Sequence, residues 1–151
     1  MELDKDFNEF VKLLGDNRVR FLVVGGYAVA AHGLPRYTGD FDAWIWLDAG
    51  NAELLITALD EFGFGGLGLT AGDFIEPGVV VQLGYPPNRI DILTSIDGVN
   101  FDEAWQRRFE IEIDGRTVSF IGRHDLIVNK TAAGRPQDLA DVARLSEGQA
   151  S

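Results

Sequence analysis

Two aspartates, Asp40 and Asp42, are separated by one residue and follow a segment that begins at Gly25-Gly26. In an extended segment alternate side chains share a face, so both carboxylates point the same way, roughly 7 Å apart, while Phe41 points into the core. Two such carboxylates need a cation between them. A glycine turn that leads into a helix offers backbone amides to phosphate. The pattern therefore predicts nucleotide chemistry, with carboxylates for a metal beside amides for a phosphate.

A third carboxylate belongs to this group if the sheet closes as the pattern indicates. Asp91 lies between two isoleucines in a predicted strand at 89–93, and a neighbouring strand at 41–47 would bring it next to Asp40 and Asp42. Two carboxylates about 4 Å apart repel by roughly 4 kcal/mol at an effective dielectric constant of 20. A raised pKa, a basic side chain or a divalent metal would relieve that repulsion, and Mg²⁺ held by carboxylates and substrate phosphates is a frequent solution.

Ordinary salt bridges are the alternative for the same residues. Asp40 could pair with Arg36, and Asp42 with Arg89. We favour the metal site for the three aspartates taken together, because carboxylates that cluster in a cleft typically have a function.

The elements that position these residues follow from hydrophobic spacing and from turn residues. Helices are predicted at 3–14, 27–32, 51–62, 101–108, 124–133 and 136–145, and strands at 19–24, 41–47, 79–83 and 89–93. A hairpin is predicted around a turn at Asp114-Gly115. The glycine-rich stretch 63–72 is predicted as a loop. We therefore expect an α/β fold, a mixed β-sheet flanked by helices, in a single domain over residues 1–151.

Composition excludes some function classes. The net charge of −11 disfavours a broad basic surface for nucleic acid and suits a cationic substrate or a basic partner. The absence of cysteine excludes disulfides and thiolate metal sites. No apolar run approaches the roughly 20 residues that span a bilayer, so we expect no membrane association and a cytoplasmic location.

The motifs resemble those of the nucleotidyltransferase superfamily that includes DNA polymerase β. A hydrophobic residue before Gly-Gly, an Asp-x-Asp pair and a later aspartate between hydrophobic residues occur here as Val24-Gly25-Gly26, Asp40-Phe41-Asp42 and Ile90-Asp91-Ile92. The thirteen residues between Gly26 and Asp40, together with the R-x-T-x-D-x-D form that starts with Arg36 and Thr38, resemble the AbiEii-type enzymes. Some of these are toxins of type IV toxin–antitoxin systems. The small MNT antitoxins, with a shorter gap and a Gly-Ser, are less similar.

The C-terminal region resembles the late motif of the same family. That motif is a lysine followed by alanine, arginine and Asp-x-x-Asp, here Lys130, Ala133, Arg135, Asp138 and Asp141. The resemblance spans about residues 20–145. Two departures are that Gly26 stands where many relatives have serine, and that little chain follows the late motif, although the larger toxins have a helical region there.

The resemblance implies a Mg²⁺-dependent enzyme that transfers NMP from an NTP to a hydroxyl of an unknown acceptor, which could be a small molecule, a protein or an RNA 3′ end. Asp40, Asp42 and Asp91 would be the catalytic, metal-binding residues. The nucleotide-binding residues implied are Gly25, Gly26, Arg36, Thr38 and Lys130. A cognate toxin or antitoxin protein is an expected partner. The alternative function is a binding module of the same fold, an antitoxin or regulatory partner with weak or no catalysis.

Several side chains have more ordinary interpretations. Lys130 could be a solvated lysine, and Asp138 and Asp141 share a helix face on which pairing with an arginine is common. Trp44 and Trp46 lie on the same strand face as Asp42, where they could stack on a base but are expected to pack under a helix.

Overall fold

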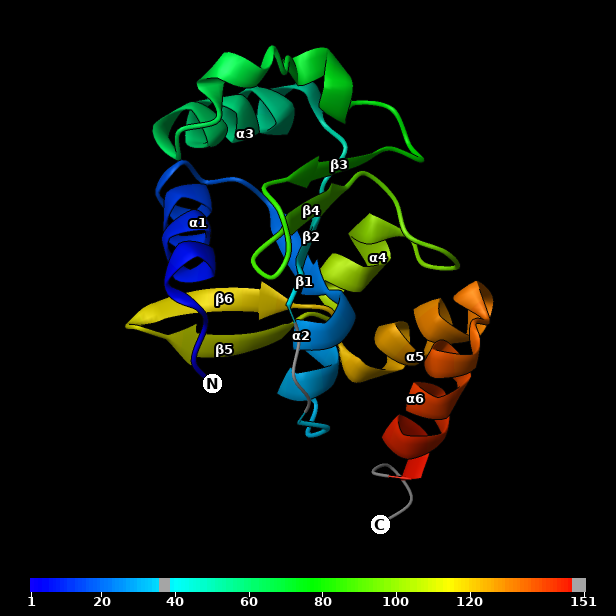
Figure 1. The fold of residues 1–151 in the computed structure, drawn as a ribbon. Helices are drawn as coiled ribbons and strands as arrows, with labels where there is room; N and C mark the ends of the chain where they lie inside the picture. The colour runs from blue at the N-terminus through cyan, green and yellow to red at the C-terminus, as the bar shows by residue number, and fades with distance from the viewer. Residues whose placement is uncertain (36–38, 148–151) are drawn as a thin grey trace.

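The computed structural model describes residues 1–35 and 39–147, which form a six-stranded mixed sheet with helices on both faces (Figure 1). The strands are β1 (Phe21–Val24), β2 (Phe41–Ile45), β3 (Val80–Leu83), β4 (Ile90–Leu93), β5 (Phe109–Ile113) and β6 (Arg116–Phe120). The helices are α1 (Lys5–Asp16), α2 (Gly25–Ala31), α3 (Ala49–Glu61), α4 (Phe101–Gln106), α5 (Arg123–Ala133) and α6 (Pro136–Glu147). The predicted fold class, a single α/β domain with a mixed sheet, is confirmed.

The strand order is β3-β4-β2-β1-β6-β5. β2 pairs in parallel with β4 and antiparallel with β1, while β1 pairs in parallel with β6. β5 and β6 form the predicted hairpin, and Asp114 and Gly115 at its turn both have positive φ. The two strands that carry the acidic residues are therefore neighbours at the centre of the sheet.

Alternation along β2 gives the two faces of the sheet different surroundings. Phe41 is fully buried, and its ring centroid lies 5.3 Å from that of Phe7 in α1. Trp44 points to the other face, where its ring meets Phe101 of α4 edge-on at 4.9 Å. Figure 1 shows α1 and α3 on one side of the sheet and α4, α5 and α6 on the other. The Asp42 face is consequently covered by α4, which confirms that Trp44 is packed under a helix.

Two local predictions differ from the structure. The glycines at 25 and 26 were predicted to form a turn before a helix at 27–32, but they are the first two residues of α2. The stretch 63–72, predicted as a loop, contains the 3₁₀ turn η1 (Gly65–Leu67) and the start of η2 (Ala71–Phe74), whose Phe74 is fully buried. Glycine spacing reveals neither these turns nor the burial of Phe74. None of the described helices has the length and apolar character needed to cross a membrane.

Candidate active site

Asp42 of the Asp-x-Asp pair and the later Asp91 meet because β2 and β4 run side by side in parallel. Asp42 and Asp91 are register partners in this pair, and Phe41 is opposite Ile90. Since alternate residues share a face, both carboxylates project from the same side of the sheet. The predicted neighbourhood of Asp42 and Asp91 is therefore present, although their separation in the sequence is 49 residues.

Arg89 connects the carboxylates of Asp40 and Asp91. Arg89 donates from Nε to Asp91 Oδ1 at 2.9 Å and from Nη2 to Asp40 Oδ2 at 2.9 Å, with a further contact of 3.1 Å to Asp91 Oδ2. The sequence alternative that paired Arg89 with Asp42 was therefore wrong about the partner. Arg89 and Asp91 are two residues apart at the start of β4, so their side chains share a face and meet directly.

Asp42 is the most perturbed acid in this part of the chain. Burial is the main cause that raises its pKa from 3.8 to about 7, followed by the negative charges of Asp91 and Asp40 and a hydrogen bond with Asp91. The positive charge of Arg89 opposes this shift without cancelling it. Near neutral pH this carboxyl therefore exchanges a proton readily, and an additional cation would favour its ionised form.

Gly25 is required at its position by both backbone and space. Its φ is +70°, a conformation that side chains with a Cβ rarely adopt. A Cβ built there would lie 1.9 Å from Asp42 Oδ2, which is far inside van der Waals contact. The absence of a side chain at Gly25 is what allows the Asp42 carboxylate to lie against the start of α2.

A cavity of about 220 Å³ opens beside Asp42. It is bounded by the junction of β1 and α2, the segment after β4, and helices α5 and α6. Its lining is formed by Val24, Gly25, Asp42, Leu93, Ser95, Ile96, Asp97, Asn129, Lys130, Ala133, Arg135 and Asp138. The cavity thus combines a protonatable carboxyl with two cationic side chains, Lys130 and Arg135.

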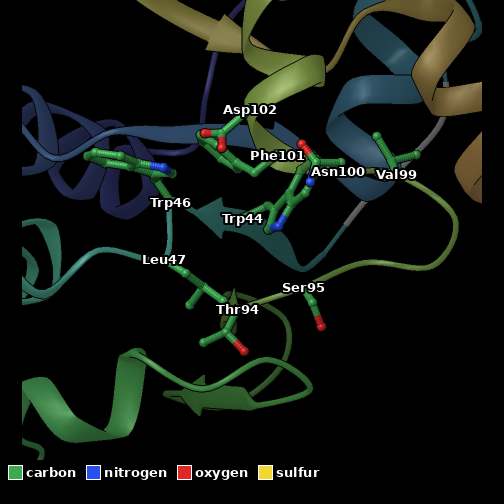
Figure 2. Close-up of a pocket in the computed structure, with 9 residues that line it drawn as sticks. All are labelled: Trp44, Trp46, Leu47, Thr94, Ser95, Val99, Asn100, Phe101 and Asp102. Atoms are coloured by element: carbon green, nitrogen blue, oxygen red, sulfur yellow. The ribbon is translucent and has the colours of Figure 1, made fainter.

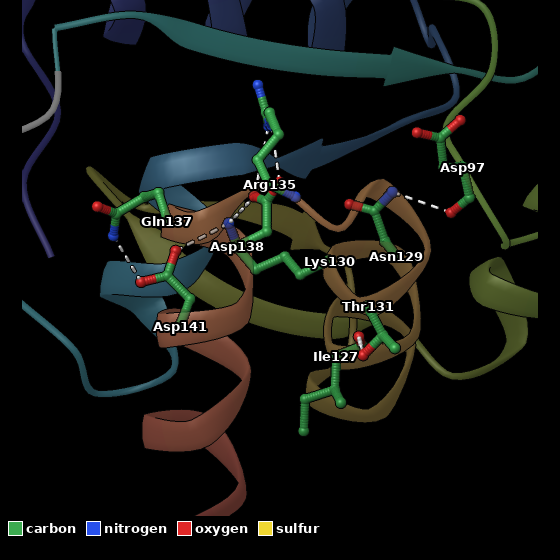
Figure 3. Close-up of polar contacts among 9 residues, drawn as sticks. All are labelled: Asp97, Ile127, Asn129, Lys130, Thr131, Arg135, Gln137, Asp138 and Asp141. Atoms are coloured by element: carbon green, nitrogen blue, oxygen red, sulfur yellow. Dashed lines mark hydrogen bonds and ion pairs between the residues drawn. The ribbon is translucent and has the colours of Figure 1, made fainter.

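The late motif forms a charged network between α5 and α6 (Figure 3). Lys130 is only 8% exposed, and its Nζ lies 3.2 Å from Asp138 Oδ1 and 2.9 Å from Asp141 Oδ2. Arg135 Nε donates to Asp138 Oδ2 at 2.7 Å. Gln137 donates to Asp141 Oδ1 at 3.1 Å. The interpretation of Lys130 as a solvated lysine was wrong, because helix packing buries it between two carboxylates.

This network holds Asp138 ionised. Burial pushes the pKa of Asp138 upward, but hydrogen bonds from Arg135 and Lys130 outweigh it and keep the pKa below 3.8. The expectation that an arginine would pair with this helix face is confirmed for Arg135 and Asp138. The network fixes α6 against α5, so the two cations that line the cavity are held by fixed partners.

The predicted residues are not all in one place. Gly25, Asp42 and Lys130 line the cavity, whereas Asp40 and Asp91 do not line it and contact Arg89. The predicted phosphate-contacting residue Gly26 follows Gly25 in the first turn of α2. Arg36 and Thr38 lie outside the described residues.

Besides Asp138, which belongs to the late motif, sequence reasoning missed four polar residues of the cavity as site residues. Ser95 and Asp97 follow β4, Asn129 precedes Lys130, and Arg135 directly precedes α6. Arg135 had a signal, because it belongs to the late motif. The other three are isolated polar residues in loops or on a helix, and only the path of the chain after β4 brings them here.

The fit of magnesium to this site depends on the acidic residues. Among residues 1–35 and 39–147, no three acidic or histidine side chains are arranged to hold a metal ion. Asp42 and Asp91 nevertheless share a register position and a hydrogen bond, and the pKa of Asp42 is raised by burial first and then by the negative charges of Asp91 and Asp40. Mg²⁺ is commonly bound by one or two carboxylates together with substrate phosphates. The pair therefore fits a magnesium ion that arrives with a nucleotide.

Two solved structures have a fold similar to that of this chain. A crystal structure from Thermotoga maritima that carries the name nucleotidyltransferase superposes with a TM-score of 0.55 at 13% identity, over 95% of this chain and 86% of that one. An antigenic nucleotidyltransferase-like protein from Paracoccidioides brasiliensis gives a TM-score of 0.54 at 16% identity, over 93% of this chain and 74% of that one. At these identities the two structures show the fold alone. No curated protein matches the sequence.

The sequence itself gives the family assignment. Residues 1–146 match a family described as "Nucleotidyltransferase of unknown function (DUF6036)". The match includes Gly25, Asp40, Asp42, Asp91 and Lys130, so it covers every element of the site described above. The chain therefore belongs to the DUF6036 family of nucleotidyltransferases.

Proposed function

We propose that this protein transfers NMP from an NTP to a hydroxyl group of an acceptor and that it depends on Mg²⁺. The observation that carries the proposal is the placement of Asp42, with its pKa near 7 and its partner Asp91, against Gly25 at the mouth of a cavity lined by Lys130 and Arg135. A site that joins acidic oxygens to cationic side chains suits a triphosphate with its metal.

Each group has a defined role in this proposal. The backbone amides at Gly25 and Gly26 and the charges of Lys130 and Arg135 face the triphosphate and hold it in the cavity. Asp42, Asp91 and Asp40 would hold the metal, and Arg89, which pairs with Asp40 and Asp91, would compete with it for these carboxylates. When bound, magnesium would neutralise the negative charge that develops on the phosphates in the transition state.

The chemical step is an in-line displacement. The acceptor hydroxyl attacks the α-phosphorus, a new phosphorus–oxygen bond forms, and the bond to the β-phosphate oxygen breaks so that pyrophosphate leaves. Asp91 takes the hydroxyl proton. Positioning of the two reactants and fixed electrostatics provide most of the rate, because the protein forms no covalent bond.

Isothermal titration with Mg-NTPs tests the site directly. We expect the wild type to bind an NTP in a metal-dependent manner and Asp42→Ala to lose that binding. Asp16→Asn is the control, since Asp16 is a surface carboxylate away from the cavity, paired with Lys12 of the same helix and with Arg116 of β6. Equal binding by wild type and Asp42→Ala would show that the carboxylate assignment is wrong.

Turnover requires a separate test because the acceptor is unknown. Incubation with each of the four α-labelled NTPs and a cell extract should label an acceptor, and Asp42→Ala should abolish the label. We further propose, from the AbiEii-like R-x-T-x-D-x-D spacing, that this activity serves a toxin–antitoxin system with a cognate protein partner. The negative net charge of −11 favours a small molecule or a protein as the acceptor over RNA, because RNA is itself negatively charged.

A second candidate function is a binding module with weak or no catalysis. The observation that favours it is the ion pairing of Arg89 with Asp40 and Asp91, which satisfies two of the three carboxylates without metal. Nucleotide binding with no labelled acceptor for any NTP, together with co-purification of a basic partner, would support this alternative over the enzyme.

A further inference from the structure

A second cavity of about 240 Å³ adjoins the first on the same face of the sheet. Its lining includes Trp44 and Trp46 from the end of β2, Ser95 after β4, and Asn100, Phe101 and Asp102 at the start of α4 (Figure 2). Ser95 lines both cavities, so they lie next to each other. We propose that this second cavity, the aromatic pocket, holds the base of the NTP whose phosphates lie beside Asp42; the proposal rests on the proposed function.

The spacing along β2 supports this placement. Trp44 is two residues beyond Asp42, so both side chains project from one face about 7 Å apart along the strand. A ribose spans a distance of this order between its phosphate and its base. A nucleotide anchored by its phosphates at Asp42 would therefore bring its base to Trp44.

The chemistry of the two cavities differs in the way that the two ends of a nucleotide differ. The first contains Lys130 and Arg135, whereas no lysine, arginine or histidine is among the described residues that line the aromatic pocket. Phosphates suit the first cavity. An uncharged, flat ring suits the second, whose walls include the edge-on pair of Trp44 and Phe101, with ring centroids 4.9 Å apart.

Trp44 supplies the observation that points to a ligand. Its side chain is 98% buried (2% exposed), yet no described residue accepts a hydrogen bond from its indole N–H. That nitrogen is not among the buried, unpartnered side-chain atoms of the described residues, so it retains access to solvent although the residue as a whole is nearly covered. Because Trp44 lines the pocket, a ligand atom there can accept this hydrogen bond.

Two further donors line the same pocket. Ser95 Oγ accepts a hydrogen bond from Gly78 N at 2.8 Å, which leaves its hydroxyl proton to donate. Asn100 Oδ1 accepts from Glu103 N at 3.2 Å as the cap of α4, which leaves its amide NH₂ to donate. Three donors around an aromatic wall match the ring nitrogens and carbonyl oxygens at the edge of a nucleobase.

The volume of the aromatic pocket suits a ligand with a single ring system. Pockets for drug-sized molecules are roughly 300–1,000 Å³. A cavity of about 240 Å³ is smaller than that and admits a base rather than a segment of protein or nucleic acid.

The test compares each NTP with tripolyphosphate, which has the charges but no base, by isothermal titration in MgCl₂. We expect at least one NTP to bind wild type tenfold or more tightly than tripolyphosphate. Asn100→Ser keeps a capping oxygen on α4 but removes the amide donor, and it should weaken NTP binding about fivefold, the loss of one hydrogen bond. Trp44→Phe should weaken it at least as much. Neither variant should change the affinity for tripolyphosphate.

Glu103→Gln is the matched control, because it changes a neighbouring residue of α4 that does not line the pocket, and it should bind like wild type. If an NTP binds no more tightly than tripolyphosphate, or if Asn100→Ser leaves NTP affinity unchanged, the base lies elsewhere and this inference is overturned while the phosphate site stands. If neither compound binds, the proposed function itself fails. Since Asn100 is exposed, its variant stays informative even if Trp44→Phe does not fold.

Discussion

Asp42→Asn should stabilise the protein at alkaline pH and have little effect at acidic pH. The native pKa of about 7 lies above the ordinary value of 3.8, so the folded protein holds a proton that the unfolded chain releases. Stability therefore falls as pH rises from about 4, and the loss is complete above about pH 7. At about 1.4 kcal/mol per pKa unit, the full penalty is about 4 kcal/mol. The neutral amide of asparagine avoids it.

Urea unfolding of both proteins at pH 4.5 and pH 8, without metal, measures this difference. The free energy of unfolding of Asp42→Asn should exceed that of wild type by about 2–4 kcal/mol at pH 8 and by much less at pH 4.5. Asp16→Asn should show the opposite sign at pH 8, because hydrogen bonds from Lys12 and Arg116 lower the pKa of that exposed carboxyl. A pH-independent difference for Asp42→Asn would refute a buried acid with a raised pKa.

Three other substitutions probe the surroundings of this acid. Gly25→Ala should cost about 1–3 kcal/mol more than Gly115→Ala in thermal unfolding, because both have positive φ but only the first places a Cβ against Asp42; equal losses would exclude the clash. Lys130→Met should lower the free energy of urea unfolding by about 3–5 kcal/mol, since it leaves two buried carboxylates without their cation, and a loss below 1 kcal/mol would indicate a solvated lysine. Arg89→Gln should be destabilised at pH 8 and gain more in melting temperature from added Mg²⁺ than wild type does. An equal gain in both proteins would show that the arginine and the metal do not share these carboxylates.

Much of the fold could be predicted from local pattern. Each predicted helix and strand is present within a few residues, because periodic burial and turn residues act over short stretches of chain. The neighbouring placement of the strands that carry Asp42 and Asp91 was also predicted, since both are short hydrophobic strands with an alternating face, whereas their parallel direction was not. The limits of α2 were not, because its first residue is a glycine with positive φ that local propensity assigns to a turn.

The sequence by itself indicated that Asp40, Asp42 and Asp91 share one face of the sheet, because alternation along a strand fixes the face on which each side chain lies, whereas Lys130 was proposed only from the resemblance of the late motif. Only the tertiary structure decided the electrostatic state of these groups. Arg89 pairs with Asp40 and Asp91 rather than with Asp42, and Lys130 is buried between helices instead of solvated. The pKa of Asp42 and the cavity beside Trp44 likewise arise from segments distant in the chain. The burial of an ionisable side chain and the charges around it depend on all the segments that pack against it, whereas spacing along the chain fixes only the face on which the side chain lies.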